Sequence, residues 1–206
     1  MVRAAAAALL LGGCTAVIVP PATPERPVCA AVLDHGRHSS LLIERPESGL
    51  VRYSYGDWEW YALGRTGSYQ GSAALLWPTQ GALGRRDLPG PATREAVTKQ
   101  VRVGTEDAVW FAVEADAARR LATELDGIFE ANAETRIYNP SADLEFVHHP
   151  DSYTLTNNSN RRVARWVAAL GATVEGSALL SDWALRQDET PGRDACAAKG
   201  PFGTSG

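Results

Sequence analysis

Two stretches of the chain repeat apolar residues at three- and four-residue steps, the spacing of a helix that buries one face. The apolar positions are Ala118, Leu121, Leu125, Ile128 and Phe129 in the first stretch, and Val163, Trp166, Val167 and Leu170 in the second. Asn157 and Asn158 are suitable N-terminal caps for the second stretch, and Gly171 follows it where helices often end. The pattern predicts helices over 115–131 and 159–170.

Short apolar or alternating runs predict strands in the first part of the chain. The expected strands are 28–33, 39–44, 51–55, 101–103 and 109–113. Residues 68–84 are rich in glycine and predict a loop or a short helix. Because strands outnumber helices and mostly precede the second helix, we expect an α+β fold, with an antiparallel sheet and helices packed on one face.

The first residues predict export from the cytoplasm. Arg3 is followed by a short apolar run, which is typical of a secretory signal and too short to span a bilayer as a helix. The segment Leu11-Gly12-Gly13-Cys14 resembles the lipobox of bacterial lipoproteins, which implies cleavage after residue 13 and a lipid on Cys14. The alternative is an ordinary secretory signal with a chance cysteine. The resemblance places the protein on the membrane of the bacterial cell envelope, facing the periplasm, without distinguishing inner from outer membrane.

The rest of the chain divides into three parts by composition. Residues 14–27 contain four prolines, which disfavour a helix or a central strand, so we expect a stiff tether there. Residues 28–185 hold the predicted helices and strands and form a single domain. Residues 186–206 are polar and glycine-rich, and predict a tail fixed at most by Cys196.

Net charge and cysteine content indicate which partners and which covalent bonds to expect. The formal net charge is -4 and there is no basic stripe, so we expect no nucleic-acid partner. Three cysteines are present, and with Cys14 lipidated two remain. In an oxidising compartment Cys29 and Cys196 are expected to form a disulfide, although two separate thiols are the alternative.

Three polar segments could form a catalytic site. They are His35-Gly36-Arg37-His38, Tyr55-Gly56-Asp57, and Asn158-Ser159-Asn160 at the start of the second helix. A nucleophile at a helix start lies in the positive end of the helix dipole, beside free backbone N–H groups. Ser159 would be that nucleophile, His38 its base, and Asp57 the group that orients the base. His35, Trp58, Asn158 and Asn160 would then bind a substrate or ligand.

Each segment also has an ordinary structural interpretation. His35 and His38 could form a polar turn with imidazoles bonded to backbone carbonyls, and Asp57 after glycine is common turn chemistry. Asn158 and Ser159 could only cap the helix. Aromatic residues such as Trp58 more often pack than bind ligands.

In their order, the three segments resemble a bacterial family known as domain of unknown function 2459. Its members carry a His-Gly-Trp-His segment, then Gly-Trp-Gly-Asp with a following Tyr, here Tyr61, and finally Asn-Cys-Asn-Thr-Trp at a helix start. The resemblance spans roughly 28–185. The His-first, Cys-last order is also similar to the permuted NlpC/P60-type, papain-like hydrolases, which implies that layout here. This chain departs from both by having Ser159 where the families have cysteine.

The presence of serine in place of cysteine at residue 159 determines which function we expect. A serine hydroxyl does not ionise as a thiol does, and needs a well-aligned base. We therefore expect a degenerate hydrolase that keeps a cleft for a cell-envelope ligand. One alternative is an active serine amidase or esterase using Ser159, His38 and Asp57. Another is a lipid-anchored partner-binding module that presents Trp58, Trp60 and Tyr61.

A zinc site is the remaining possibility. The chain's four histidines, His35, His38, His148 and His149, are the right residue type for zinc. However, His148 and His149 are adjacent and would point to opposite faces of a strand. No cysteine pair or glutamate lies at ligand spacing, so we expect neither a metal nor another cofactor.

Overall fold

A seven-stranded, fully antiparallel sheet forms the centre of the computed structural model, which describes residues 15–46, 48–65, 77–186 and 196. The strand order is β6-β2-β3-β4-β5-β8-β7. The strands are β2 (Pro27–Asp34), β3 (Ser39–Arg45), β4 (Gly49–Asp57), β5 (Thr79–Leu88), β6 (Asp107–Glu114), β7 (Ile137–Asn139) and β8 (Leu144–Tyr153). The α+β class and the antiparallel sheet expected from the sequence are confirmed.

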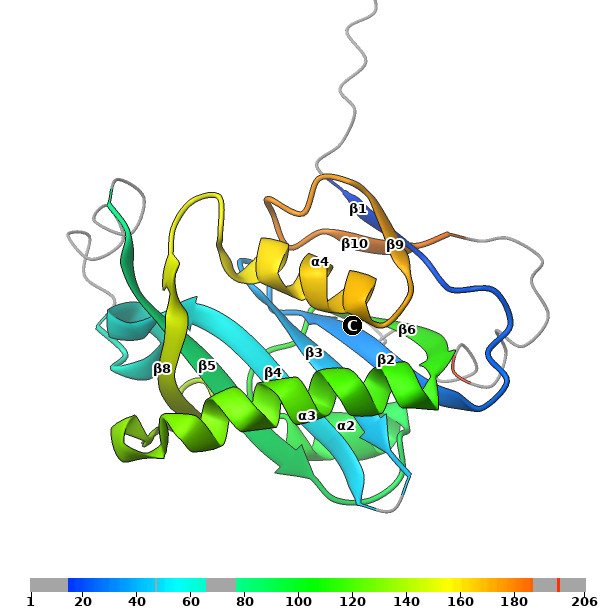
Figure 1. Ribbon diagram of the computed structural model, residues 1–206, viewed down its shortest axis with the longest axis horizontal. Helices are drawn as coiled ribbons and strands as arrows, with labels where there is room; N and C mark the ends of the chain where they lie inside the picture. The colour runs from blue at the N-terminus through cyan, green and yellow to red at the C-terminus, as the bar shows by residue number, and fades with distance from the viewer. Residues whose placement is uncertain (1–14, 47, 66–76, 187–195, 197–206) are drawn as a thin grey trace, which may run out of the picture.

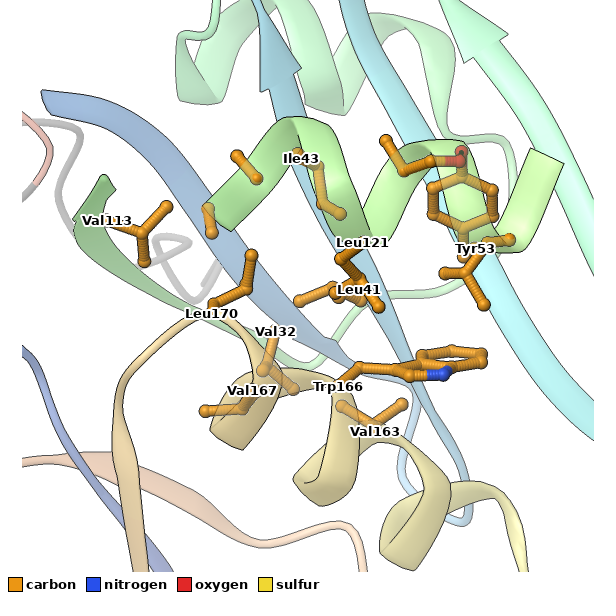
Figure 2. Close-up of a cluster of buried hydrophobic side chains, with 14 of the residues drawn as sticks. Val32, Leu41, Ile43, Tyr53, Val113, Leu121, Val163, Trp166, Val167 and Leu170 are labelled. Atoms are coloured by element: carbon orange, nitrogen blue, oxygen red, sulfur yellow. Dashed lines mark hydrogen bonds between the residues drawn. The ribbon is translucent and has the colours of Figure 1, made fainter. Parts of the chain in front are cut away.

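Two long helices cover one face of this sheet (Figure 1). They are α3 (Ala115–Ala131) and α4 (Ser159–Ala169), close to the predicted ranges. Trp166 and Val167 of α4 and Leu121 of α3 point toward Val32 and Leu41 of the sheet (Figure 2). These buried side chains form the main core, because burying apolar surface is the largest favourable contribution to folding.

The opposite face is covered as well, which corrects the expectation of helices on one face only. The short helix α2 (Arg94–Gln100) lies behind the sheet in Figure 1. Val97 of α2 and Val101, which caps its C-terminus, pack against Leu42 and Leu50 of the sheet. Residues 101–103 are therefore not a strand. The sequence pattern missed α2 because seven residues with one buried apolar side chain carry almost no helical repeat.

A second sheet of three strands, with the order β10-β1-β9, lies beside α4. Its strands are β1 (Ala16–Val19), β9 (Thr173–Gly176) and β10 (Trp183–Leu185). The expected tether is thus wrong over residues 16–19, which form the central strand of this sheet. The prolines lie only after Val19, so they leave the backbone N–H groups of β1 free to pair. The segment expected to be a loop over 68–84 is also corrected, since β5 begins at Thr79.

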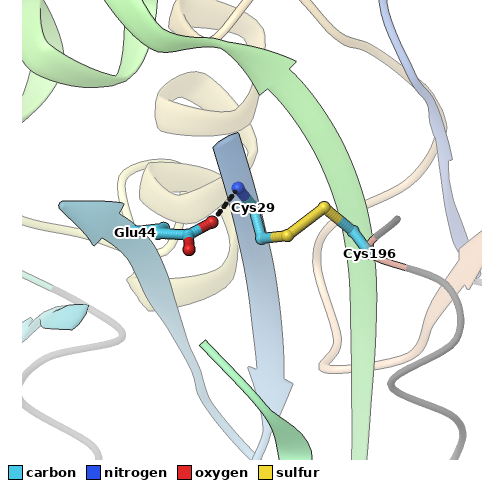
Figure 3. The surroundings of a disulfide bond; sticks show 3 residues. All are labelled: Cys29, Glu44 and Cys196. Atoms are coloured by element: carbon cyan, nitrogen blue, oxygen red, sulfur yellow. Dashed lines mark hydrogen bonds between the residues drawn. A yellow bond between two sulfur atoms is a disulfide. The ribbon is translucent and has the colours of Figure 1, made fainter. Parts of the chain in front are cut away.

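Cys29 and Cys196 form a disulfide, as expected from the sequence. Cys29 lies in β2, and its backbone N–H donates to the Glu44 carboxylate of β3 at 2.7 Å (Figure 3). The bond joins residues 167 positions apart and fixes Cys196 of the predicted tail to the central sheet. The rest of 187–206 lies outside the described residues.

Two short helical turns complete the fold: η1 (Trp58–Ala62) and η2 (Ala133–Thr135). η1 follows β4 directly and packs on β5 and β8. No helix in the described part of the chain combines the length and the apolar character needed to cross a bilayer.

Candidate functional site

A cleft of about 1080 Å³ opens at the end of the central sheet where β2 turns into β3. Its walls come from the turn 35–38, the η1 region, the loop 102–106 and the turn 139–142. The side chains most relevant to chemistry are His35, Arg37, His38, Trp60, Tyr61, Arg102 and Glu106. Two of the predicted site residues, His35 and His38, therefore line the same cleft.

His35 is held by hydrogen bonds on both ring nitrogens. Its Nδ1 donates to the carbonyl of Gly104 at 2.8 Å. Its Nε2 lies 3.1 Å from Nη2 of Arg52, which has only N–H groups to offer, and 2.9 Å from Oγ of Ser40. Burial, then Arg52 and His38, lower the pKa of His35 to about 3. His35 is thus a neutral imidazole of fixed tautomer whose nitrogens are already engaged.

The His38 ring is held only by ring contacts. It stacks on His35 at 4.9 Å between centroids and meets the edge of Tyr61 at 5.1 Å. Within the described residues no hydrogen bond is made by its ring nitrogens. Burial, followed by the charge of Arg52, lowers the pKa of His38 to about 4. The imidazole is therefore neutral near pH 7.

Asp57 is engaged elsewhere and does not orient His38. It caps η1: one carboxylate oxygen accepts from the backbone N–H of Trp60 at 2.8 Å, and the other accepts from the hydroxyl of Thr79 at 2.5 Å. Among the described residues neither oxygen bonds to the His38 ring. The interpretation of Asp57 as turn chemistry is the one that the geometry favours, because the capping interaction uses the carboxylate.

Ser159 begins α4 as expected, but it lies below the surface with 2% of its area exposed. Its side chain is a hydrogen-bonding neighbour of Tyr61, which lines the cleft while Ser159 does not. Burial raises the pKa of Tyr61 to about 12, against the lowering effect of Ser159. Tyr61 fits this position because Gly56 has no side chain: a Cβ there would approach the Tyr61 ring to 2.1 Å. Tyr61 therefore stands between the cleft and Ser159.

Asn158 and Asn160 hold the structure around the helix start. The Asn158 side chain accepts from the backbone N–H of Arg161 at 2.9 Å, which is the N-cap expected from the sequence. The Asn160 carbonyl accepts from the hydroxyl of Ser39 at 2.9 Å. Both amides donate to the carbonyl of Leu179, in the loop between β9 and β10. These contacts use the side chains that were expected to bind a ligand.

The loop between β9 and β10 was not anticipated from the sequence. The hydroxyl of Ser181 in this loop lies 2.9 Å from that of Ser39 and donates to the carboxylate of Asp34 and to the backbone carbonyl of His38. Burial raises the pKa of Asp34, against the lowering effect of the hydrogen bonds from Ser181 and from the backbone of Gly36. The loop thus ties the His38 turn to the start of α4.

The aromatic residues of η1 do not form one surface. Trp58, expected to bind a ligand, packs edge-on against His148 with 4.2 Å between ring centroids and does not line the cleft. Trp60 and Tyr61 line it. The partner-binding surface proposed from the three aromatic residues is therefore divided between a packing contact and the cleft.

Arg52 is a residue of the site that the sequence did not single out. It lies in β4, is 1% exposed, and contacts Ser40 and His35 behind the cleft. Burial, then the nearby charge of Arg86, lower its pKa to about 9, so it remains charged near pH 7. Arg52 belongs to the segment 51–55 that was expected to be a strand, and it is buried because both faces of the sheet are covered.

The four histidines are divided between the turn after β2 and strand β8. Among the described residues, no three His, Cys, Asp or Glu side chains are arranged to hold a metal ion. His149 is 2% exposed, and its Nδ1 accepts from the backbone N–H of Asp151 at 2.9 Å. Its ring meets Tyr55 edge-on at 5.0 Å. Cys14, the expected lipidation site, lies outside the described residues.

Comparisons of the chain with protein-family models, with curated proteins and with solved structures found no match.

Proposed function

We propose that this protein is a lipid-anchored binding protein of the bacterial cell envelope, whose domain keeps the layout of a permuted papain-like hydrolase without its catalysis. The layout is supported by the contact between the start of β3 and the start of α4, where Ser39 bonds to Asn160. This contact brings the His38 turn to a helix N-terminus that bears Ser159.

Loss of catalysis rests mainly on the position of Tyr61. A serine nucleophile needs a base within hydrogen-bond reach and an open path to the substrate. Ser159 is 2% exposed and adjoins Tyr61, and no hydrogen bond joins it to His38 within the described residues. The cleft in front of Tyr61 is left as a binding site.

The lipid anchor follows from the lipobox resemblance, and its position implies which side of the domain faces the membrane. β1 begins two residues after Cys14, so at about 3.5 Å per residue the lipid would lie about 7 Å from the small sheet. The loop between β9 and β10 is tied to the same place, since the backbone N–H of Ala16 donates to the carbonyl of Asp182. Leu179 and Leu180 of this loop are 36% and 55% exposed and would face the bilayer. If Cys14→Ser protein still partitions into membranes, this anchor is refuted.

A fluorophosphonate probe tests the absence of serine catalysis. Such probes label serines that a neighbouring base activates. We expect no labelling of the purified protein, and Ser159→Ala serves as the control. Labelling of the wild type but not of Ser159→Ala would refute the proposal and establish the second candidate, a serine amidase or esterase. The observation favouring that candidate is His38, which is neutral near pH 7 and has no hydrogen-bond partner on its ring among the described residues.

A further inference from the structure

Arg52 carries a buried charge that is surrounded by neutral partners. Its Nε donates to Oγ of Ser40 at 3.0 Å, Nη1 to the carbonyl of Ala142 at 3.2 Å, and Nη2 to Nε2 of His35 at 3.1 Å. A guanidinium has five N–H donors, so one on each of Nη1 and Nη2 is left over. Within the described residues, no carboxylate lies within 4.0 Å of it. A buried charge without a counter-charge is costly, which points to a partner supplied from outside.

The neighbouring carboxylate is already committed. Asp143 is 1% exposed and forms an ion pair with Arg86, which lies directly opposite Arg52 across β4 and β5. Its oxygens also accept from the hydroxyl of Tyr138 and from the backbone N–H of Arg102. Asp143 is thus committed to Arg86, whose side chain is 28% exposed, and the buried Arg52 keeps a positive charge that no described carboxylate neutralises.

The excess charge lies next to the cleft. His35 and Ala142, which accept hydrogen bonds from Arg52, both belong to the cleft wall. Arg37 and Arg102 add positive charge at the wall and Glu106 adds one negative charge. The field in the cleft therefore favours an anion, and low-dielectric walls strengthen that field.

We propose that the cleft binds a small organic molecule bearing a carboxylate, and that this carboxylate pairs with Arg52 between the His35 ring and the Ala142 carbonyl. The inference rests on the proposed function, because it takes the cleft to be the binding site. One N–H on each of Nη1 and Nη2 remains after the hydrogen bonds described above, and a guanidinium is able to present two N–H groups to the two oxygens of a carboxylate. Trp60 and Tyr61 supply apolar surface for the rest of the molecule.

Sodium acetate is the probe, because it presents the carboxylate alone. We expect acetate to shift the imidazole NMR signals of His35 and His38 saturably and to raise the melting temperature, since a ligand that binds only the folded state stabilises it. Acetamide and sodium chloride at equal concentration are the matched controls and should do neither. No saturable shift with acetate, or an equal response to chloride, overturns the proposal. Tighter binding of phosphate than of acetate overturns the carboxylate assignment.

Substitutions of Arg52 test whether the carboxylate binds at this residue. Arg52→Gln should weaken acetate binding by about tenfold, because it removes a charge-assisted pair, and Arg52→Lys, which keeps the charge but loses the fork, should fall between. If Arg52→Gln does not fold, variants of two exposed residues in the loop 102–106 test whether the cleft binds an anion. Arg102→Gln removes a positive charge and should weaken acetate binding by about twofold, and Glu106→Gln removes a negative charge and should strengthen it about as much. Unchanged affinity in the folded variants overturns the proposal. Fluorophosphonate labelling of Ser159 would refute the absence of catalysis and leave the acetate result standing, so the two failures are distinguishable.

Discussion

Arg52 and Arg86 lie opposite each other on β4 and β5, and the buried carboxylate of Asp143 pairs with Arg86 and not with Arg52. Arg52 instead donates to His35, whose ring stacks on His38. One unneutralised charge thus lies beside the two histidines at the cleft and adds to the effect of burial in lowering their pKa values. The first prediction follows from this arrangement.

Replacing Arg52 should raise the pKa values of both cleft histidines. Burial is the largest cause of their low pKa values and Arg52 the next, so Arg52→Gln should move the pKa of His38 up from about 4 without reaching 6.5. Imidazole NMR titration measures this. Arg102→Gln is the control, because that cation lines the cleft but does not contribute to either shift. An unchanged pKa of His38 in Arg52→Gln would contradict this account of the site.

The protein should lose stability as the pH falls from about 6.5 toward 4. The folded-state pKa values of His35, His38 and His149, about 3, 4 and 4, lie below the ordinary value of 6.5. Between these values the unfolded chain binds protons that the folded chain does not, so the free energy of unfolding rises with pH in this range. The stabilising contribution of the three histidines is complete above about pH 6.5. Urea unfolding at several pH values tests this. His38→Gln should show a shallower decline, and an identical slope would exclude His38 as a contributor.

We expect a residue larger than glycine at position 56 to clash with the Tyr61 ring. A Cβ at residue 56 would lie 2.1 Å from the Tyr61 ring, so Gly56→Ala should destabilise the fold by about 1–3 kcal/mol. Gly127 is the matched control: it lies in α3 with nothing within 4 Å of its Cβ position. Gly127→Ala should stabilise by about 0.5–1 kcal/mol, because alanine favours a helix. Equal effects of the two changes, measured by urea unfolding, would show that Tyr61 is not held as described.

Removing the disulfide should cost up to about 5 kcal/mol of unfolding free energy, because the bond closes a long loop and restricts the unfolded chain. Cys196→Ser tests this, and Cys14→Ser is the control that removes a cysteine outside the bond. The expected result is a lower urea midpoint for Cys196→Ser alone. Equal midpoints for the two variants would mean that the bond contributes nothing to stability.

The features that could be predicted from the sequence are those set by local repeats. The helices around Leu125 and Val167 and the strands of the first half follow from apolar spacing, and Asn158 from capping preference. β1 was missed because the prolines after Val19 dominated the composition of its segment. β9 and β10 were missed because each has only three or four residues and pairs with a distant part of the chain.

The site was predicted only where its residues are close in sequence. His35 and His38 share one turn and do line one cleft. Arg52, Tyr61 and Ser181 reach the site through strand register, a glycine contact and a loop from another sheet. None of these relations leaves a local pattern. Chain order alone suggested an arrangement of Ser159, His38 and Asp57, and among the described residues no hydrogen bond joins these three side chains.

The most direct test of the central claim is the reactivity of a thiol placed at residue 159. In Cys14→Ser protein kept unreduced, Ser159→Cys provides a single free thiol, since Cys29 and Cys196 are bonded. If Tyr61 separates residue 159 from the cleft, iodoacetamide should modify Ser159→Cys only on the timescale of unfolding, and adding Tyr61→Ala should accelerate the reaction many-fold. Rapid modification of Ser159→Cys with Tyr61 in place would contradict the account, because residue 159 would then be open to a substrate.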